Sequence, residues 1–159
     1  VERAAAEGCT VGLGTDGMSS AMLRALRAAF LVQRAGREDP TVGFEAHPEL
    51  LENNAVVARR FMGEPLLGML TPGAPADICV VDSPPPTPIG HENLFGHLVY
   101  GASEAPVRHT IARGRILLED FRHTTLDPEA IAKAARVEAF GLWERFRELG
   151  TSGNGVLKI

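Results

Sequence analysis

An acidic residue set among glycines is the feature of this sequence with the clearest chemical potential. Residues 12–17 read Gly-Leu-Gly-Thr-Asp-Gly, overlapping the short apolar run Cys9–Leu13. We expect Asp16 to lie at the end of a buried strand, where α/β barrels build their active sites. A hard, anionic oxygen ligand there can bind a divalent cation. It can also accept a proton from a metal-bound water whose pKa the cation lowers to about 7.

The same residues allow two other interpretations. Their spacing satisfies G-x-G-x-x-G, the dinucleotide-binding fingerprint, but that motif needs a second strand ending in an acid about 20 residues later. Here the interval is a helical pattern followed by Arg37-Glu38-Asp39-Pro40, and the Asp16 carboxylate would repel a pyrophosphate. Asp16 could instead be a structural acid at a helix N-terminus, favoured by the helix dipole. The residues alone leave the catalytic and the structural interpretation open.

The elements around Asp16 are those of an α/β protein. Val1–Glu7 is Ala-rich and predicts a helix that ends at Gly8. Cys9–Leu13 predicts a strand buried on both faces. Ser19–Ala35 has apolar residues at helical spacing, with Ser19 or Ser20 as the expected N-cap. Pro48–Met62 predicts a further helix, with proline in its first turn.

After Gly63 the sequence becomes rich in glycine, proline and short apolar runs. Four runs predict strands: Ile78–Val81, Leu94–Tyr100, Val107–Ala112 and Arg115–Leu118. Arg113-Gly114 is the expected corner of a hairpin, because glycine supplies the positive φ that such turns require. Asp127 is expected to cap a long helix from Pro128 to about Leu149. We therefore expect three segments: 1–62, 63–125, and 126–159 with a terminal tail.

Composition bounds the class of protein. The 159 residues include 16 Lys+Arg and 20 Asp+Glu, giving a net charge of −4, and 45% are hydrophobic. The apolar content is enough for a folded core. The mildly acidic charge balance argues against a general nucleic-acid binder. No apolar run approaches the ~20 residues of a membrane span. Cys9 and Cys79 form no CxxC pair, so we expect a cytoplasmic protein without disulfides or a structural zinc knot.

Several motifs together resemble the C-terminal third of the amidohydrolase superfamily, in its branch of metal-dependent deaminases and chlorohydrolases. They begin with VGLGTDGMSS and LRAAFLVQR. Residues 73–82 then follow the pattern G-x-x-A-D-I-x-V-V-D, and PPTPIGHENLFGHLVYG and TIARGRILLED come later. The Gly-Thr-Asp-Gly turn is moderately specific alone and becomes specific when joined to the second motif.

This resemblance implies a (β/α)8 barrel that carries a small β-sandwich built from both chain ends. Residues 9–15 would be the eighth barrel strand, Ser19–Ala35 the eighth helix, and 67–120 the C-terminal share of the sandwich. Asp16 would be both metal ligand and proton shuttle. Water on a zinc or iron ion would attack a ring or amidine-like carbon of a small-molecule substrate, releasing ammonia or chloride. The resemblance also implies a homo-oligomer.

The sequence departs from the family in its histidines. The family binds metal through a His-x-His pair and two further histidines on barrel strands. Here the five histidines lie at 47, 91, 97, 109 and 123, and no two are separated by one residue. A barrel needs about 250 residues, so we expect a C-terminal fragment that needs the missing N-terminal barrel portion. By itself it should be inactive and bind metal weakly, since catalytic zinc usually takes three protein ligands.

Two alternatives accompany this hypothesis. The β-rich segment could be a non-catalytic interaction or assembly module derived from such an enzyme. His91 and His97 could form a metal pair, although turn or surface positions are the simpler interpretation. We expect His109 to be a half-buried, hydrogen-bonded imidazole on the hairpin, and Asp77 to bind backbone N–H groups.

Overall fold

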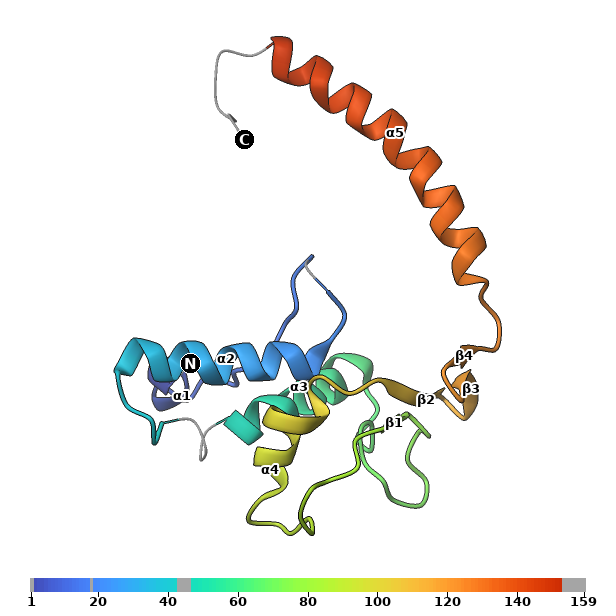
Figure 1. Ribbon diagram of the computed structural model, residues 1–159. Helices are drawn as coiled ribbons and strands as arrows, with labels where there is room; N and C mark the ends of the chain where they lie inside the picture. The colour runs from blue at the N-terminus through green and yellow to red at the C-terminus, as the bar shows by residue number, and fades with distance from the viewer. Residues whose placement is uncertain (1, 18, 43–46, 153–159) are drawn as a thin grey trace. The chain divides into compact units, whose positions relative to one another are not determined.

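The computed structural model describes residues 2–17, 19–42 and 47–152 (Figure 1). The chain divides into two compact units, Val1–Arg122 and His123–Ile159, and each is described by itself. The terminal tail expected after the last helix lies, from residue 153 onward, outside the described residues. The boundaries of the three expected segments stay predictions.

Three helices open the first unit: α1 (Glu2–Ala6), α2 (Met22–Arg37) and α3 (His47–Met62). The sequence predicted all three, from alanine content, helical spacing and first-turn residues respectively. The expected serine cap of α2 is wrong, because Ala21 occupies the N-cap and no side chain caps it. The Ala21 N–H instead donates to the hydroxyl oxygen of Ser19, two residues before it, at 3.2 Å. Glu38 ends the helix in the left-handed conformation, at φ 53°.

The buried core lies between α2 and a short helical segment that follows the prolines. Leu26 and Phe30 of α2 and Val99 are fully buried together. Phe95 and Tyr100 each meet the Phe30 ring edge-on, with centroids 5.8 Å apart. These aromatic pairs add to the burial of apolar area.

The prediction of a strand at Leu94–Tyr100 is wrong. The chain there forms α4 (Leu94–Gly96) and the π-helix η1 (His97–Ala102). Short apolar runs do not distinguish a strand from a buried helix by periodicity. Two contacts accompany the helical outcome: Val99 inserts beside Phe30, and buried Ser103 Oγ donates to the Val99 carbonyl at 2.7 Å.

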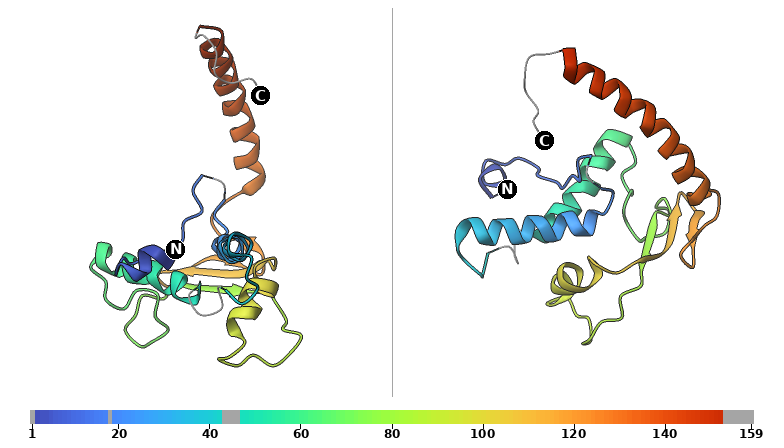
Figure 2. Two further views of the ribbon diagram at one scale, coloured as in Figure 1. Left: turned by 90° about the vertical axis from the view of Figure 1, so that its left-hand side faces the viewer. Right: turned by 45° about the horizontal axis from the view of Figure 1, so that its top comes forward.

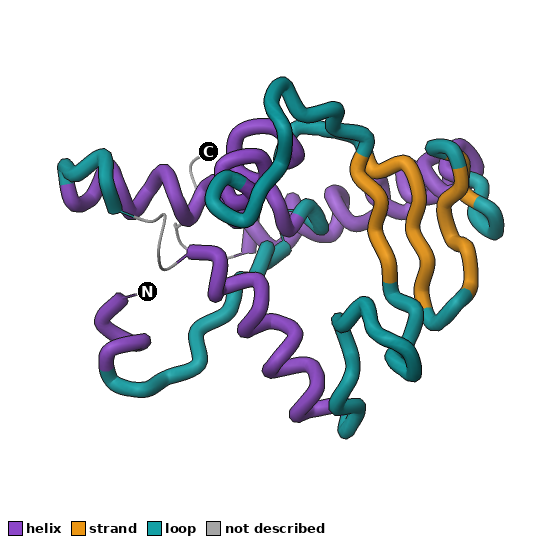
Figure 3. The backbone as a smooth tube through the Cα atoms, turned by 90° about the horizontal axis from the view of Figure 1, so that it is seen from below, coloured by secondary structure: helices purple, strands orange, loops and turns teal. Residues whose placement is uncertain are grey.

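A four-stranded sheet follows, in the order β1-β2-β3-β4. Its strands are β1 (Ile78–Val81), β2 (Val107–Ala112), β3 (Arg115–Glu119) and β4 (Arg122–His123). The first three lie side by side (Figures 2 and 3), and β2 is antiparallel to both neighbours. Each pairing contains one irregularity, between Val80 and Val81 and between Thr110 and Ile111. The predictions for these three strands are confirmed to within one residue.

The corner between β2 and β3 confirms the expected hairpin. Arg113 and Gly114 have φ values of 48° and 75°, as the turns preferred between twisted strands require. The Arg113 N–H donates to Asp77 Oδ1 at 2.7 Å, and the Gly114 N–H donates to the Ala76 carbonyl. As expected, Asp77 therefore binds a backbone N–H group. This group belongs to Arg113 at the hairpin corner and not to the turn that precedes Asp77.

The predicted strand at Cys9–Leu13 does not form in the structure. Residues 9–15 run as loop between α1 and the turn at Asp16 (Figure 3). A strand requires a neighbour to complete its ladder of hydrogen bonds, and the described residues provide none there. The fold thus combines helices with an antiparallel sheet, while the parallel barrel and the sandwich stay predictions.

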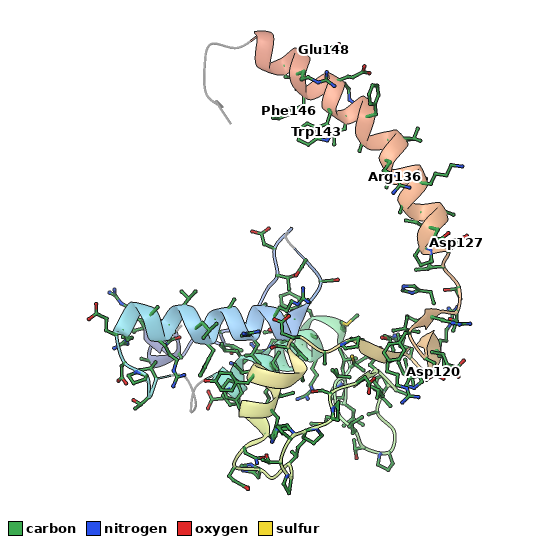
Figure 4. All side chains as sticks on the ribbon, in the orientation of Figure 1. Asp120, Asp127, Arg136, Trp143, Phe146 and Glu148 are labelled. Carbon is green, nitrogen blue, oxygen red and sulfur yellow. The ribbon has the colours of Figure 1, made fainter. Side chains whose placement is uncertain are left out.

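The second unit is built on α5 (Pro128–Ser152). Asp127 caps it as expected, because Asp127 Oδ1 accepts the N–H groups of Glu129 and Ala130 at 3.0 Å each. Trp143 and Phe146 lie one turn apart on this helix (Figure 4) and meet edge-on at 5.6 Å. Among the described residues, no helix combines the length and apolar character that crossing a bilayer demands.

Candidate functional site

Asp16 lies at an exposed turn between the loop 9–15 and α2. Its backbone has a positive φ of 52°, which is uncommon for a residue with a side chain. Asp16 Oδ1 accepts the N–H of Gly17 at 2.6 Å. Within the described residues its other oxygen, Oδ2, has no hydrogen bond or ion pair. The carboxylate is therefore oriented by its own turn and offers one oxygen to a ligand.

Two adjacent asparagines on α3 bind the chain just before this turn. Asn54 Oδ1 accepts the N–H of Leu13 at 2.7 Å. Asn53 Nδ2 donates to the carbonyl of Val11 at 2.8 Å. Nothing in the sequence analysis singled out these residues. The signal that could have found them is a pair of amide side chains inside an otherwise amphipathic helix, where asparagine is a poor helix former.

The three glycines of the motif have different surroundings. A Cβ added at Gly12 would lie 2.3 Å from Asn54 Oδ1, whereas at Gly14 and Gly17 it would meet nothing within 4 Å. Gly12 thus permits the close approach of α3. The space at Gly14 and Gly17 is open beside Asp16.

The dinucleotide interpretation gains no support from the structure. Its fingerprint needs a strand before the glycines and another leading to the acid. Residues 9–15 are loop, and Met22 to Glu38 are helix α2 and its C-terminal cap. The described residues therefore lack both strands of the fingerprint.

The described residues do not bring the sequence's other metal candidates together. No group of three or more His, Cys, Asp or Glu side chains among them could hold a metal ion. His97 Nε2 lies 3.3 Å from Thr87 Oγ1, so this histidine pairs with a hydroxyl. The side chain of His47 lies outside the described part of the chain. Asp16 thus stands alone as the candidate ligand here.

His109 occupies the half-buried position expected on the hairpin. Its Nδ1 accepts the N–H of Asp120 at 3.3 Å, and its Nε2 lies 3.7 Å from Asp120 Oδ1. Arg108 Nε donates to the same Asp120 oxygen at 2.8 Å. This hydrogen bond, followed by the charge of Arg108, holds the pKa of Asp120 below its ordinary value. These contacts stabilise the β3–β4 turn, where Asp120 is labelled in Figure 4.

A surface hollow of about 600 Å³ lies elsewhere in the first unit. It is lined by residues 63–66, 73–76 and 113–114, and Asp16 is not among them. Arg113 and Glu64 form an ion pair across it. Glu64 and Arg113, the charged residues of its lining, are joined by this ion pair, and Glu64 Oε2 is buried without a hydrogen-bond partner among the described residues.

Comparison with known proteins gives a consistent result. The model of the Amidohydrolase family matches residues 1–117. A 5-methylthioadenosine/S-adenosylhomocysteine deaminase of Pelotomaculum thermopropionicum is 34% identical over 144 residues, which cover 87% of this chain and 32% of that protein. A 5'-deoxyadenosine deaminase of Methanosarcina acetivorans is 32% identical over 139 residues, covering 84% and 31%. The chain spans about a third of the length of these curated relatives.

Proposed function

Because the chain belongs to the amidohydrolase family, we propose that it is the C-terminal part of a metal-dependent aminohydrolase acting on an adenosine derivative. The observation that carries this proposal is the family match over residues 1–117, a range that includes Asp16 and strands β1 and β2. Relatives named as deaminases of adenosine derivatives favour release of ammonia over release of chloride.

The residues present fit one ligand position of a metal site. The Asp16 carboxylate is exposed and chemically suited to a divalent cation. Zinc, however, takes three protein ligands in catalytic sites, and the described residues hold no such group. The remaining ligands would come from protein outside this chain. The choice between zinc and iron stays a prediction.

The proposed reaction is hydrolysis of a carbon–nitrogen bond. The oxygen of water bonds to the amino-bearing ring carbon, the carbon–nitrogen bond breaks, and ammonia leaves with a proton from the water. A metal held by Asp16 and by ligands from outside this chain would supply a water of lowered pKa. Asp16 Oδ2 would accept a proton from the attacking water and return it to the leaving nitrogen. The Gly17 N–H is bound to Oδ1, so Oδ2 is the oxygen available for both transfers.

A missing N-terminal barrel portion is the expected partner of this chain. Large apolar side chains are exposed on α2 and at the end of α3, among them Val32 at 71% and Phe61 at 86%. Exposed apolar patches on one surface are typical of interfaces. Burial of these side chains would be the physical basis of assembly. The expected homo-oligomer and cytoplasmic location are further predictions.

A chimera tests the proposed function. This chain replaces the matching segment of the Pelotomaculum relative, and ammonia release from 5-methylthioadenosine is measured. We expect turnover, and Asp16→Asn should lower kcat by about 10²–10⁴-fold, the usual contribution of a positioned proton-transfer group. Asp39→Asn is the control, since the Asp39 carboxylate is bound by the N–H and hydroxyl of Thr41 in the loop after α2 and lies outside the motif. Undiminished turnover in Asp16→Asn contradicts the proposal.

The non-catalytic alternative has one supporting observation, which is that β1 to β3 complete their pairing within this chain. Under that alternative, a correctly folded chimera would not release ammonia, and Asp16→Asn would change nothing measurable.

A further inference from the structure

The backbone just before Asp16 is bound by side chains where a strand would be bound by a neighbouring backbone. Asn53 donates to the Val11 carbonyl, and Asn54 accepts from the Leu13 N–H, at 2.8 and 2.7 Å. In an extended chain the carbonyl of one residue and the N–H two residues later point to the same side. The two amides therefore supply one donor and one acceptor to the same edge of the segment.

The contact is specific in shape as well as in polarity. Gly12 lies between the two bound residues, and its missing Cβ leaves the space that Asn54 Oδ1 occupies. Asn54 Nδ2 reaches Met22 Sδ at 3.7 Å, which orients the amide with its oxygen toward Leu13. Gly12 and Asn54 are thus complementary in shape, because a side chain at position 12 would occupy the space of the Asn54 amide.

Leu13 connects this contact to the core. Its side chain packs against the buried cluster of Leu26, Phe30 and Val99. Its backbone N–H is bound to α3 at the same time. Only Gly14 and Thr15 separate this doubly anchored residue from Asp16. The position of Leu13 therefore limits where the Asp16 carboxylate can lie.

We propose that Asn53 and Asn54, the asparagine pair, are positioning residues that hold the Asp16 carboxylate in place through the backbone of residues 11–13. The inference rests on the proposed role of Asp16. The pair does not touch the reacting atoms. Its contribution is to geometry, and displacements of about 1 Å can lower a catalysed rate by about 10²-fold.

Aspartate substitutions at the two neighbouring positions provide a reciprocal test. Asn54→Asp keeps the acceptor for the Leu13 N–H. Asn53→Asp removes the donor and places a carboxylate against the Val11 carbonyl. In the 159-residue chain, hydrogen exchange at the Leu13 amide should stay near the wild-type rate in Asn54→Asp and rise by about tenfold in Asn54→Ala. Equal exchange in the wild type and Asn54→Ala would overturn the proposal.

The chimera with the Pelotomaculum relative supplies the catalytic readout. Asn53→Asp and Asn54→Ala should lower kcat by about 10–100-fold with KM and zinc content unchanged, and Asn54→Asp should retain most of the activity. Asn93→Ala is the matched control, because Asn93 also binds two backbone groups, the Gly90 N–H and the Pro88 carbonyl. It lies in a different turn and should not change kcat.

The outcomes separate the two proposals. If Asp16→Asn abolishes turnover but the asparagine variants keep the wild-type kcat, the positioning role is wrong and the proposed function stands. If Asp16→Asn leaves turnover unchanged, the proposed function is wrong. A kcat loss in Asn93→Ala equal to that in Asn54→Ala would show a general structural effect and would also overturn the positioning role.

Discussion

The segment 9–17 and the sheet of β1 to β3 each contain apolar runs that predict strands, but their backbones are bound in different ways. In the sheet, backbone groups pair with backbone groups of the adjacent strands. In the segment, two backbone groups pair with the side chains of Asn53 and Asn54. The strands of the sheet pair with one another within this chain, whereas the segment is bound on one side by side chains of α3. The proposed catalytic residue lies in the region bound by side chains.

The comparison shows why the same apolar pattern gave two outcomes. Cys9–Leu13 and Ile78–Val81 both predicted strands, and only the second forms one. β1 finds β2 in the antiparallel register Ile78 to Ile111. Parallel strands need neighbours contributed by distant parts of a chain, and the described residues place no strand beside Cys9–Leu13.

The largest expected effect comes from removing the fully buried aromatic ring of the α2–η1 core, on which Leu13 of the segment packs. Phe30 is fully buried beside Val99, and Leu13 packs on the same cluster. Phe30→Ala should lower the free energy of unfolding by about 3–5 kcal/mol, as for other buried aromatic residues. Urea unfolding monitored by circular dichroism measures it. Phe61→Ala, at a site 86% exposed, should stay within about 0.5 kcal/mol.

If Phe30→Ala unfolds the segment 9–17 and leaves the sheet folded, the two regions fold independently. If it unfolds both together, the α2–η1 core stabilises both. We expect the joint loss, because Val99 lies between the prolines and β2 in the chain.

The hairpin corners offer a smaller effect restricted to the sheet. Gly114 has φ 75°, so Gly114→Ala should cost about 1 kcal/mol of stability through backbone strain. Phe121 has φ 66° although it carries a bulky side chain. Phe121→Gly should therefore raise stability by up to about 1 kcal/mol. Thermal unfolding should show opposite shifts of Tm. Shifts of the same sign would contradict the strain argument.

Acid should affect the sheet through Asp120. Arg108 lowers the pKa of Asp120 below its ordinary 3.8. A carboxyl group with a lowered folded-state pKa contributes stability above its unfolded value, and this contribution is lost as pH falls through the folded-state pKa. We expect the loss below pH 3.8, and a small one, because the pair is exposed. Unfolding of Asp120→Asn at a series of acidic pH values should show a shallower decline than the wild type.

The smallest expected signal is that of metal binding, because we expect this chain alone not to retain a metal ion. Asp16 offers one ligand where catalytic zinc usually takes three. After incubation with zinc and dialysis against a chelator, we expect far less than one zinc ion per chain by elemental analysis. The chimera serves as the positive control. One retained ion per isolated chain would show that the segment is a complete site, and the contrast with the sheet would disappear.

Local sequence rules determined the elements whose stabilising groups lie nearby. The cap at Asp127 depends on contacts within three residues. The corner at Arg113-Gly114 was predicted from the positive φ that its glycine permits, and helix α2 from its amphipathic spacing. The motif around Asp16 could likewise be found from residue types alone. Its family resemblance agrees with the family match.

Only the tertiary structure decided which apolar runs became strands and what holds the proposed catalytic turn. Leu94–Tyr100 became helical against α2, and Cys9–Leu13 became a loop bound by α3. The asparagine pair lies about forty residues from the backbone it binds, as the separations of 41 and 42 show. Pattern rules compare residues only a few positions apart. Hydrogen bonds of this kind form because folding brings distant polar groups together, and buried polar groups must find such partners.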